Sequence, residues 1–126
     1  MTNKNIRWGI IGLGKIANKF ATDLASIETA ELVAVASRNI QNANNFAEKH
    51  NAKKAYSSYE ELAKDTNVDA VYIATPHSFH KEHAILCLQN KKAVLCEKPF
   101  AMNLSEVTEM IQVAKENNVL LMEALW

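Results

Sequence analysis

All three glycines of the chain lie within six residues of one another near the N-terminus, and two of them have a spacing that suits phosphate binding. Gly12, Gly14 and Ala17 read as G-x-G-x-x-A, in which the third position packs a helix closely and tolerates alanine. Glycine has no Cβ, so it permits positive φ and lets backbone amides approach a ligand. A turn of this kind would direct the amides of the next residues, Lys15 and Ile16, at a pyrophosphate. The alternative is a turn that serves structure alone.

Ser37 and Arg38 form a second candidate position, because they follow an apolar run. A dinucleotide-binding fold usually carries Asp or Glu at this point, where the carboxylate accepts hydrogen bonds from the ribose of NAD. This chain has a hydroxyl and a guanidinium instead, and a guanidinium can pair bidentately with a phosphate and stack on adenine. We therefore expect a cofactor with a 2′-phosphate, NADP in preference to NAD. The alternative for Arg38 is a solvated surface side chain.

Thr75, Pro76 and three histidines follow another buried run. Pro76 removes a backbone donor and biases Thr75 toward an extended shape, which would stop a strand where a nicotinamide ribose would lie. His77 and His80 are candidates for contacts with the cofactor or site, although a helical histidine is more often structural, and His83 is expected to be structural. A zinc site is disfavoured, because His80 and His83 have no evident carboxylate or thiolate partner.

Glu97, Lys98 and Pro99 form the fourth candidate position, directly after the apolar run from Ala93 to Cys96. Lys98 could hydrogen-bond a substrate oxygen or donate a proton to it during hydride transfer, so we predict that it is catalytic. Glu97 could pair with Lys98 or contact the nicotinamide ribose. Pro99 would fix the backbone here with a trans or a cis peptide bond. The alternative is a solvated turn.

The elements that must position these residues alternate between short β-rich runs and amphipathic stretches. We expect strands at about 6–11, 31–37, 53–56, 70–75, 93–97 and 119–124. Five helices are expected. The first has a buried stripe from Ile16 to Ile27, and the second runs from Ile40 to His50 with Asn39 as its cap. A capping box at Ser58 opens a short third helix, and the last two span 78–90 and 104–117. In the last of these, Leu104, Val107, Ile111 and Ala114 are expected to face inward.

Several of the expected strands are almost continuously apolar, as they are when both faces of a parallel sheet are covered. Right-handed crossovers then give an α/β, doubly wound parallel sheet of the Rossmann type, with six strands in the order 3-2-1-4-5-6. Ligands of such sheets bind beyond the carboxyl ends of the strands, where all four candidate positions fall. The 126 residues correspond to one dinucleotide-binding domain spanning 1–126.

The composition of the chain limits the classes of binding partner that we expect. The 14 basic and 14 acidic residues cancel without any block of like charge, which disfavours nucleic acid and membrane surfaces and favours a small-molecule substrate. The apolar runs are too short to span a bilayer and the first residues lack a signal-peptide core, so we expect a cytoplasmic location. Cys87 and Cys96 match neither a metal-ligand spacing nor a redox pair and are expected to be buried thiols.

Four segments together resemble the N-terminal domain of the Gfo/Idh/MocA family of NAD(P)-dependent oxidoreductases. They occur in the family's order along the whole chain, and the Glu-Lys-Pro triplet is much more specific than the glycine turn. The segments are Trp8 to Ala17, Ala36 to Asn39, Ala74 to Pro76 with His80, and Cys96 to Pro99. His77 departs from the asparagine that is common after the proline, and the ending Met122 to Trp126 resembles that of the dihydrodiol dehydrogenase-like subgroup.

The resemblance implies a role for each segment. Residues 12 to 17 would bind pyrophosphate, Ser37 and Arg38 the adenosine 2′-phosphate, and Thr75 to His80 the nicotinamide side. Lys98 would be the lysine of the catalytic site, Glu97 would contact the cofactor ribose, and Trp126 would wall the nicotinamide pocket. Family members continue into a substrate domain that also tends to form dimers, and we expect this chain to be an isolated or truncated cofactor domain. We therefore expect this chain to bind NADP, to turn over little substrate by itself, and to form a homo-oligomer only with that domain present.

The leading function is thus the cofactor half of an NADP-dependent dehydrogenase that moves a hydride between nicotinamide and a hydroxyl-bearing carbon of a sugar, cyclitol or dihydrodiol. A second hypothesis is a non-catalytic nucleotide-sensing module, since a fold does not dictate activity. A third is an adenosylmethionine-dependent methyltransferase, which also uses a glycine turn. Such enzymes usually have a carboxylate where Arg38 stands, so this residue disfavours the methyltransferase hypothesis.

Overall fold

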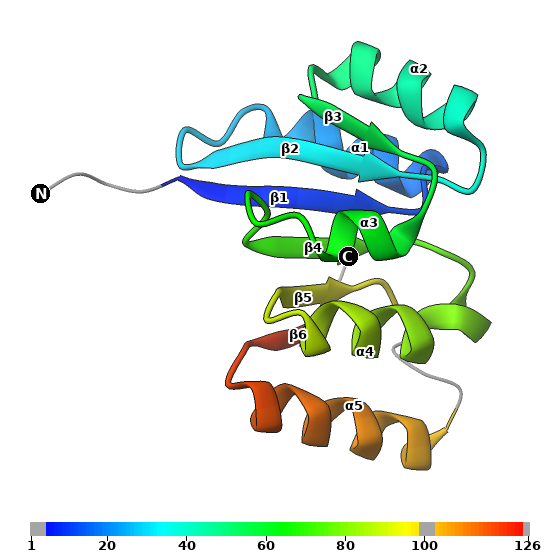
Figure 1. The fold of residues 1–126 in the computed structure, drawn as a ribbon, viewed down its shortest axis with the longest axis vertical. Helices are drawn as coiled ribbons and strands as arrows, with labels where there is room; N and C mark the ends of the chain where they lie inside the picture. The colour runs from blue at the N-terminus through cyan, green and yellow to red at the C-terminus, as the bar shows by residue number, and fades with distance from the viewer. Residues whose placement is uncertain (1–4, 99–102, 125–126) are drawn as a thin grey trace, which may run out of the picture.

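Six parallel strands form a single twisted sheet in the order β3-β2-β1-β4-β5-β6 (Figure 1). The computed structural model describes residues 5–98 and 103–124. The strands are β1 (Ile6–Ile11), β2 (Ala30–Ala36), β3 (Lys54–Tyr56), β4 (Ala70–Ile73), β5 (Ala93–Cys96) and β6 (Leu121–Glu123). The predicted α/β fold and strand order are therefore confirmed.

Helices connect the strands and cover both faces of the sheet. They are α1 (Lys15–Leu24), α2 (Ile40–His50), α3 (Tyr59–Ala63), the 3-10 turn η1 (His77–Phe79), α4 (His80–Gln89) and α5 (Leu104–Asn117). One buried cluster contains residues of α1 and α2, and a second contains residues of α3, α4 and α5. In Figure 1, α1 lies behind the sheet, whereas α3 and α4 lie in front of it.

The central strands are apolar on both faces because both faces are covered. Ile10, Val35 and Tyr72 point toward α1 and α2, while Ile11, Val71 and Ile73 point toward α3 and α4, and all six side chains are fully buried. Parallel pairing joins β1 to β2 on one side and to β4 on the other. The loops that leave these three strands consequently meet at one edge of the sheet.

Helix starts follow the predicted capping residues. The Asn39 side chain accepts hydrogen bonds from the amides of Gln41 and Asn42, and the Ser58 hydroxyl accepts one from Glu61. Asn103 caps α5 in the same way, through the amide of Glu106. These oxygens satisfy amide groups that have no carbonyl partner inside the helix.

Three predicted core positions were wrong. Ile27 is 49% exposed because α1 ends at Leu24, and Ile27 lies in the following turn. Leu104 is 79% exposed and Ile111 is 43% exposed. Helix α5 packs on α4 at the β5–β6 end of the sheet and buries only Met110 and Ala114 fully, so its apolar positions on other sides face outward.

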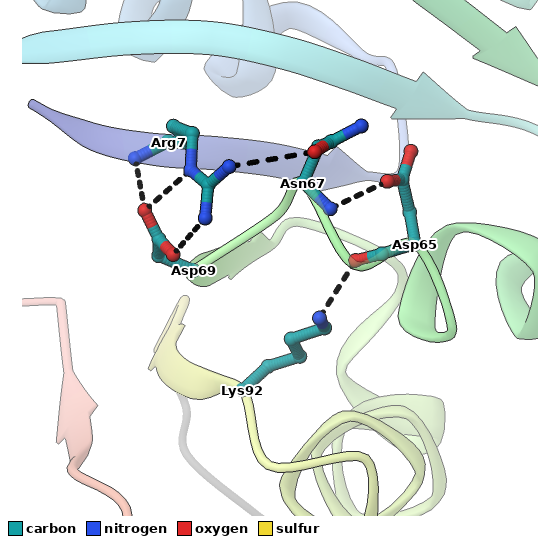
Figure 2. Close-up of polar contacts among 5 residues, drawn as sticks. All are labelled: Arg7, Asp65, Asn67, Asp69 and Lys92. Carbon is teal, nitrogen blue, oxygen red and sulfur yellow. Dashed lines mark hydrogen bonds and ion pairs between the residues drawn. The ribbon is translucent and has the colours of Figure 1, made fainter.

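A polar network joins the loops at the amino end of the sheet (Figure 2). The Arg7 guanidinium donates hydrogen bonds of 3.0 Å to both carboxylate oxygens of Asp69, and this contact holds the pKa of Asp69 below its usual value. Nearby, the buried Lys92 ammonium donates to the Asp65 carbonyl at 2.7 Å, while burial lowers the pKa of Lys92. These contacts lie at the end of the strands opposite the predicted site.

Cys87 and Cys96 are both fully buried, as predicted. Burial raises the pKa of each thiol to about 12, so both are protonated at neutral pH. Over residues 5–98 and 103–124, no helix is long and apolar enough to cross a membrane.

Candidate functional site

A cleft of about 550 Å³ opens at the carboxyl ends of β1, β2 and β4. Its lining includes six of the residues predicted from the sequence, contributed by three separate loops. They are Gly12, Gly14, Ser37, Arg38, Thr75 and Pro76. Because β1 lies between β2 and β4, the glycine turn forms the centre of the cleft and the other two loops form its sides.

Gly12 lets the first loop lie directly on the end of β4. Its φ is +89°, a conformation that residues with a Cβ rarely adopt. A Cβ added to it would lie 2.7 Å from the carbonyl carbon of Ala74 and 2.7 Å from the amide nitrogen of Thr75. Both contacts are with backbone, which cannot rotate away. Any side chain at Gly12 would therefore push the floor of the cleft apart.

Gly14 differs from Gly12, since a Cβ added to it would meet nothing within 4 Å. Gly14 is the N-cap of α1, and no side chain caps this helix, in contrast to α2, α3 and α5. Lys15 and Ile16 form its first turn, which contains no acidic residue. The positive end of the helix dipole therefore faces open space beside exposed backbone, an arrangement that suits a phosphate.

Asn18 secures this turn from the next turn of α1. Its side-chain amide donates to the Gly14 carbonyl at 3.0 Å, and its backbone amide donates to the same oxygen at 3.1 Å. The side-chain oxygen of Asn18 lies 2.8 Å from His50 Nε2 in α2. The glycine turn is thus held by two helices without a side chain entering the space in front of it.

The loop after β2 presents Ser37 and an exposed Arg38 to the cleft. The Asn39 amide donates to the Ser37 hydroxyl oxygen at 3.2 Å, and the Ser37 amide donates to the Tyr56 carbonyl at 3.1 Å. These bonds fix the start of the loop, while the guanidinium stands in solvent at its edge. The segment from Ser37 to Asn39 contains no carboxylate.

The loop after β4 runs through Pro76 into the η1 turn. His77 is exposed, whereas His80 is 1% exposed and its Nε2 lies 2.8 Å from the carbonyl oxygen of Thr75. The structure thus places His80 beneath the loop, against the backbone of a residue that lines the cleft. Its predicted contact with a cofactor stays a prediction.

A second hollow, of about 330 Å³, adjoins the cleft and shares Arg38, Tyr59, Thr75 and Pro76 with it. His83 forms one wall: its Nδ1 lies 2.8 Å from the Thr75 hydroxyl oxygen, and its ring packs edge-on to Tyr59 at 4.7 Å. Burial is the main reason that the pKa of His83 is lowered, and it outweighs the nearby carboxylates of Glu82 and Glu60, which raise the pKa. At neutral pH the ring is consequently uncharged.

The loop after β5 carries Glu97 and Lys98 one strand further along the sheet. The Glu97 amide donates to the Ile73 carbonyl at 3.0 Å, and its carboxylate accepts a hydrogen bond from the buried phenol of Tyr72. Lys98 is exposed, and neither residue lines the two hollows described above. The predicted contacts of Pro99 and Trp126 lie outside the described residues.

Sequence reasoning did not single out Tyr59 and Asn42 for the site, and it expected His83 to be structural. Tyr59 and Asn42 line the cleft from the first turns of α3 and α2, and His83 lines the adjoining hollow. One pattern could have indicated Asn42 and Tyr59, since each lies within three residues of a capping residue that closely follows a strand of the predicted sheet. No local pattern indicates His83, because its place in the wall depends on a contact with Thr75, eight residues earlier.

Comparisons with known proteins agree with this geometry. The sequence model of an oxidoreductase family with an NAD-binding Rossmann fold, Gfo/Idh/MocA, matches residues 6–125. The chain is 54% identical over 123 residues to trans-1,2-dihydrobenzene-1,2-diol dehydrogenase of Mus musculus, and 48% identical over 122 residues to the protein of that name from Xenopus tropicalis. These alignments cover 96% and 95% of this chain but only 37% of each relative.

Solved structures show the same fold. A 3-ketoreductase from Actinomadura kijaniata, in complex with TDP-benzene and NADP, superimposes with a TM-score of 0.92 at 33% identity, over 95% of this chain and 38% of that one. A scyllo-inositol dehydrogenase from Lactobacillus casei, with bound NAD(H) and scyllo-inositol, has a TM-score of 0.87 at 25% identity, over 96% of this chain and 36% of that one.

Proposed function

Because the chain belongs to the Gfo/Idh/MocA oxidoreductase family, as an NAD-binding Rossmann domain, we propose that the cleft at the carboxyl ends of β1, β2 and β4 binds NADP in preference to NAD. The pyrophosphate would lie at the first turn of α1, the adenosine half beside β2, and the nicotinamide half toward β4 and β5. Ligands of doubly wound sheets bind at this position, where the strand order reverses between β1 and β4.

The contrast between Gly12 and Gly14 carries the dinucleotide part of the proposal. Gly12 has no room for a Cβ, because it packs directly against the backbone of Ala74 and Thr75. At Gly14 the space is open, and α1 starts without a side-chain cap. Because Gly14 has no side chain and lies beside exposed helix amides, a ligand can approach the backbone closely there.

The preference for NADP rests on Ser37 and Arg38. A carboxylate after β2 would accept hydrogen bonds from a ribose 2′-hydroxyl and would repel a 2′-phosphate. Arg38 lines the cleft and also the adjoining hollow, so its guanidinium can reach a 2′-phosphate from the edge of either. The solved relative from Actinomadura kijaniata contains NADP, whereas that from Lactobacillus casei contains NAD(H). The cofactor of this chain therefore has to follow from its own residues.

We further propose that the whole protein is a dehydrogenase acting on a hydroxyl-bearing carbon of a sugar, cyclitol or dihydrodiol. When bound, the nicotinamide supplies the hydride chemistry. Lys98 would hydrogen-bond the reacting oxygen and hold or release its proton, and Glu97 would orient the ribose on the nicotinamide side. The chain spans little more than a third of its curated relatives. We therefore expect the substrate pocket and most of the turnover to require further residues.

Titration of the purified chain with NADPH, NADH and adenosylmethionine tests this proposal. We expect NADPH to bind at least tenfold more tightly than NADH, a difference of about 1.4 kcal/mol. Adenosylmethionine should not bind. Equal affinity for the two coenzymes would refute the NADP preference, and tighter binding of adenosylmethionine would refute the dinucleotide site itself.

A further inference from the structure

We propose that Tyr72 is a positioning residue, which fixes the carboxylate of Glu97 for the ribose on the nicotinamide side of the cofactor. This inference rests on the proposed dinucleotide site and extends it to a residue in the middle of the sheet. Tyr72 lies in β4 and is fully buried, the largest such side chain in the described part of the protein. No feature of its local sequence separates it from the other apolar residues of that strand.

The ring of Tyr72 is held by aromatic packing. It stacks on Phe20 of α1, with ring centroids 4.0 Å apart and planes at 13°. Trp8 of β1 packs against Phe20 in a T-shaped arrangement, with ring centroids 5.3 Å apart. Phenylalanine would fill the same space at Tyr72 without needing a hydrogen-bond partner, so the phenolic hydroxyl needs a separate explanation.

The hydroxyl donates to Oε2 of Glu97. Tyr72 pairs with Leu95 across β4 and β5, and side chains two residues apart on an extended chain point to the same face. Glu97 therefore projects on the face covered by α1, where the phenol meets it. A half-buried carboxylate bonded to a rigid, buried hydroxyl keeps one orientation instead of rotating in solvent.

This arrangement connects the two ends of the proposed site. Phe20 belongs to α1, the helix whose first turn faces the pyrophosphate, and Glu97 stands at the end of β5 beside Lys98. Tyr72 touches both Phe20 and Glu97. A ribose hydroxyl that donates to Glu97 would thus meet a carboxylate whose position is fixed, through Tyr72 and Phe20, relative to α1. The first turn of α1 is the proposed site of the phosphates. Such preorganisation raises affinity because less motion has to be frozen on binding.

Tyr72→Phe tests the inference, because it retains the ring and removes only the hydroxyl. Binding of two ligands is compared by titration: NADPH, and 2′,5′-ADP, which lacks the nicotinamide half. We expect the Kd of NADPH to rise up to about tenfold, because the released Glu97 side chain would have to be ordered on binding, and the Kd of 2′,5′-ADP to change less than twofold. In a Glu97→Ala background the same substitution should change the Kd of NADPH less than twofold, because its partner is already gone.

Tyr56→Phe is the matched control. Tyr56 also donates a phenolic hydrogen bond to a carboxylate, that of Asp65, at 2.7 Å; the residue is half-buried and lines neither hollow. This control should lower the melting temperature and leave both affinities unchanged. The inference is overturned if Tyr72→Phe behaves like the control, if it weakens both ligands equally, or if its effect persists without Glu97. Failure of the wild type to bind 2′,5′-ADP would instead count against the proposed function.

Discussion

Gly12 lies so close to the backbone of Thr75 that a Cβ on the glycine would come within 2.7 Å of the Thr75 amide nitrogen. This contact joins the loop after β1 to the loop after β4 at the floor of the cleft. At Gly14, two residues later, an added Cβ would meet nothing within 4 Å. The two glycines therefore have separable roles, one in the fold and one in binding.

Gly12→Ala should destabilise the protein strongly. A residue with a Cβ loses about 1–2 kcal/mol of stability in the positive-φ conformation that Gly12 adopts, and the clash with the backbone adds to this loss. We expect a loss of roughly 3 kcal/mol and a melting temperature lower by about 10 °C, followed by circular dichroism. Gly9→Ala is the control and should cost less, because its new Cβ would meet only the side chains of Leu62 and Val68, which can shift. A loss below about 3 °C in Gly12→Ala would contradict this account.

Gly14→Ala should leave stability within about 1 kcal/mol of the wild type, since φ is −90° and no atom lies within reach of the new methyl. The same methyl would stand where the pyrophosphate has to approach the amides of α1. We expect the Kd of NADPH to rise at least tenfold in a fluorescence titration. An unchanged Kd would show that the phosphates do not bind there.

Arg38→Ala should remove the preference for NADPH over NADH by weakening mainly NADPH, because the charge of the guanidinium acts on the 2′-phosphate, whereas its stacking on adenine is common to both coenzymes. The affinity for NADH should change less than about twofold. Lys115→Ala, which removes an exposed positive charge from α5 and so tests for a general effect of net charge, should preserve the preference. If Arg38→Ala retains the wild-type ratio of the two affinities, the role of Arg38 is refuted.

The order of the elements could be predicted from the sequence because short apolar runs and capping residues mark most of the boundaries locally. Asn39 and Ser58 cap their helices where expected, and the strand order follows from right-handed crossovers. Ile27 could not be placed, because its periodicity continues that of α1 while the chain has already turned at Ala25. Helical spacing alone does not say where a helix ends.

The site was partly predictable for a similar reason. Residues that directly follow strands, such as Ser37 and Thr75, must reach the same edge of a parallel sheet. The contact between Tyr72 in β4 and Glu97, which directly follows β5, joins positions 25 residues apart and depends on the register of the two strands. No local pattern contains that information.

His83 should make stability depend on pH. Its pKa is lowered in the folded protein, mainly by burial, so the unfolded chain binds more protons below its own pKa of about 6.5. Stability therefore falls as the pH drops through about 6.5 toward the folded pKa, and is fully present above it. In His83→Gln, the slope of the unfolding free energy between pH 7.5 and 5 should be smaller by up to about 1.4 kcal/mol per pH unit, measured in urea.

His77→Gln serves as the control for this slope, because His77 stands exposed in the neighbouring turn. The groups that face His83 include Glu60 of α3, His80 and Glu82 of α4, and Arg38. An identical slope in the wild type and His83→Gln would show that the ring is protonated equally in both states.

Asp69→Asn should lower stability at pH 7 by about 1 kcal/mol, since its partly exposed ion pair with Arg7 is also hydrogen-bonded. Arg7 lowers the pKa of Asp69, so this stabilisation is complete above the unfolded pKa of about 3.9 and is lost as the pH falls through the folded value. The difference from the wild type should disappear in acid.

Asp23→Asn is the matched control for that experiment, because it breaks an exposed i,i+4 pair with Lys19. It should cost less than about 0.5 kcal/mol. Both variants should bind NADPH like the wild type, since neither carboxylate lies at the cleft. A loss of coenzyme affinity in Asp69→Asn would show that the two ends of the sheet are coupled.

The most direct test of the account is a crystal structure of the chain grown with saturating NADPH. We expect pyrophosphate oxygens within about 3 Å of the amide nitrogens in the first turn of α1, and the 2′-phosphate beside Arg38. Coenzyme bound elsewhere, or a first turn whose amides face only solvent while NADPH is present in the crystal, would contradict the central claim.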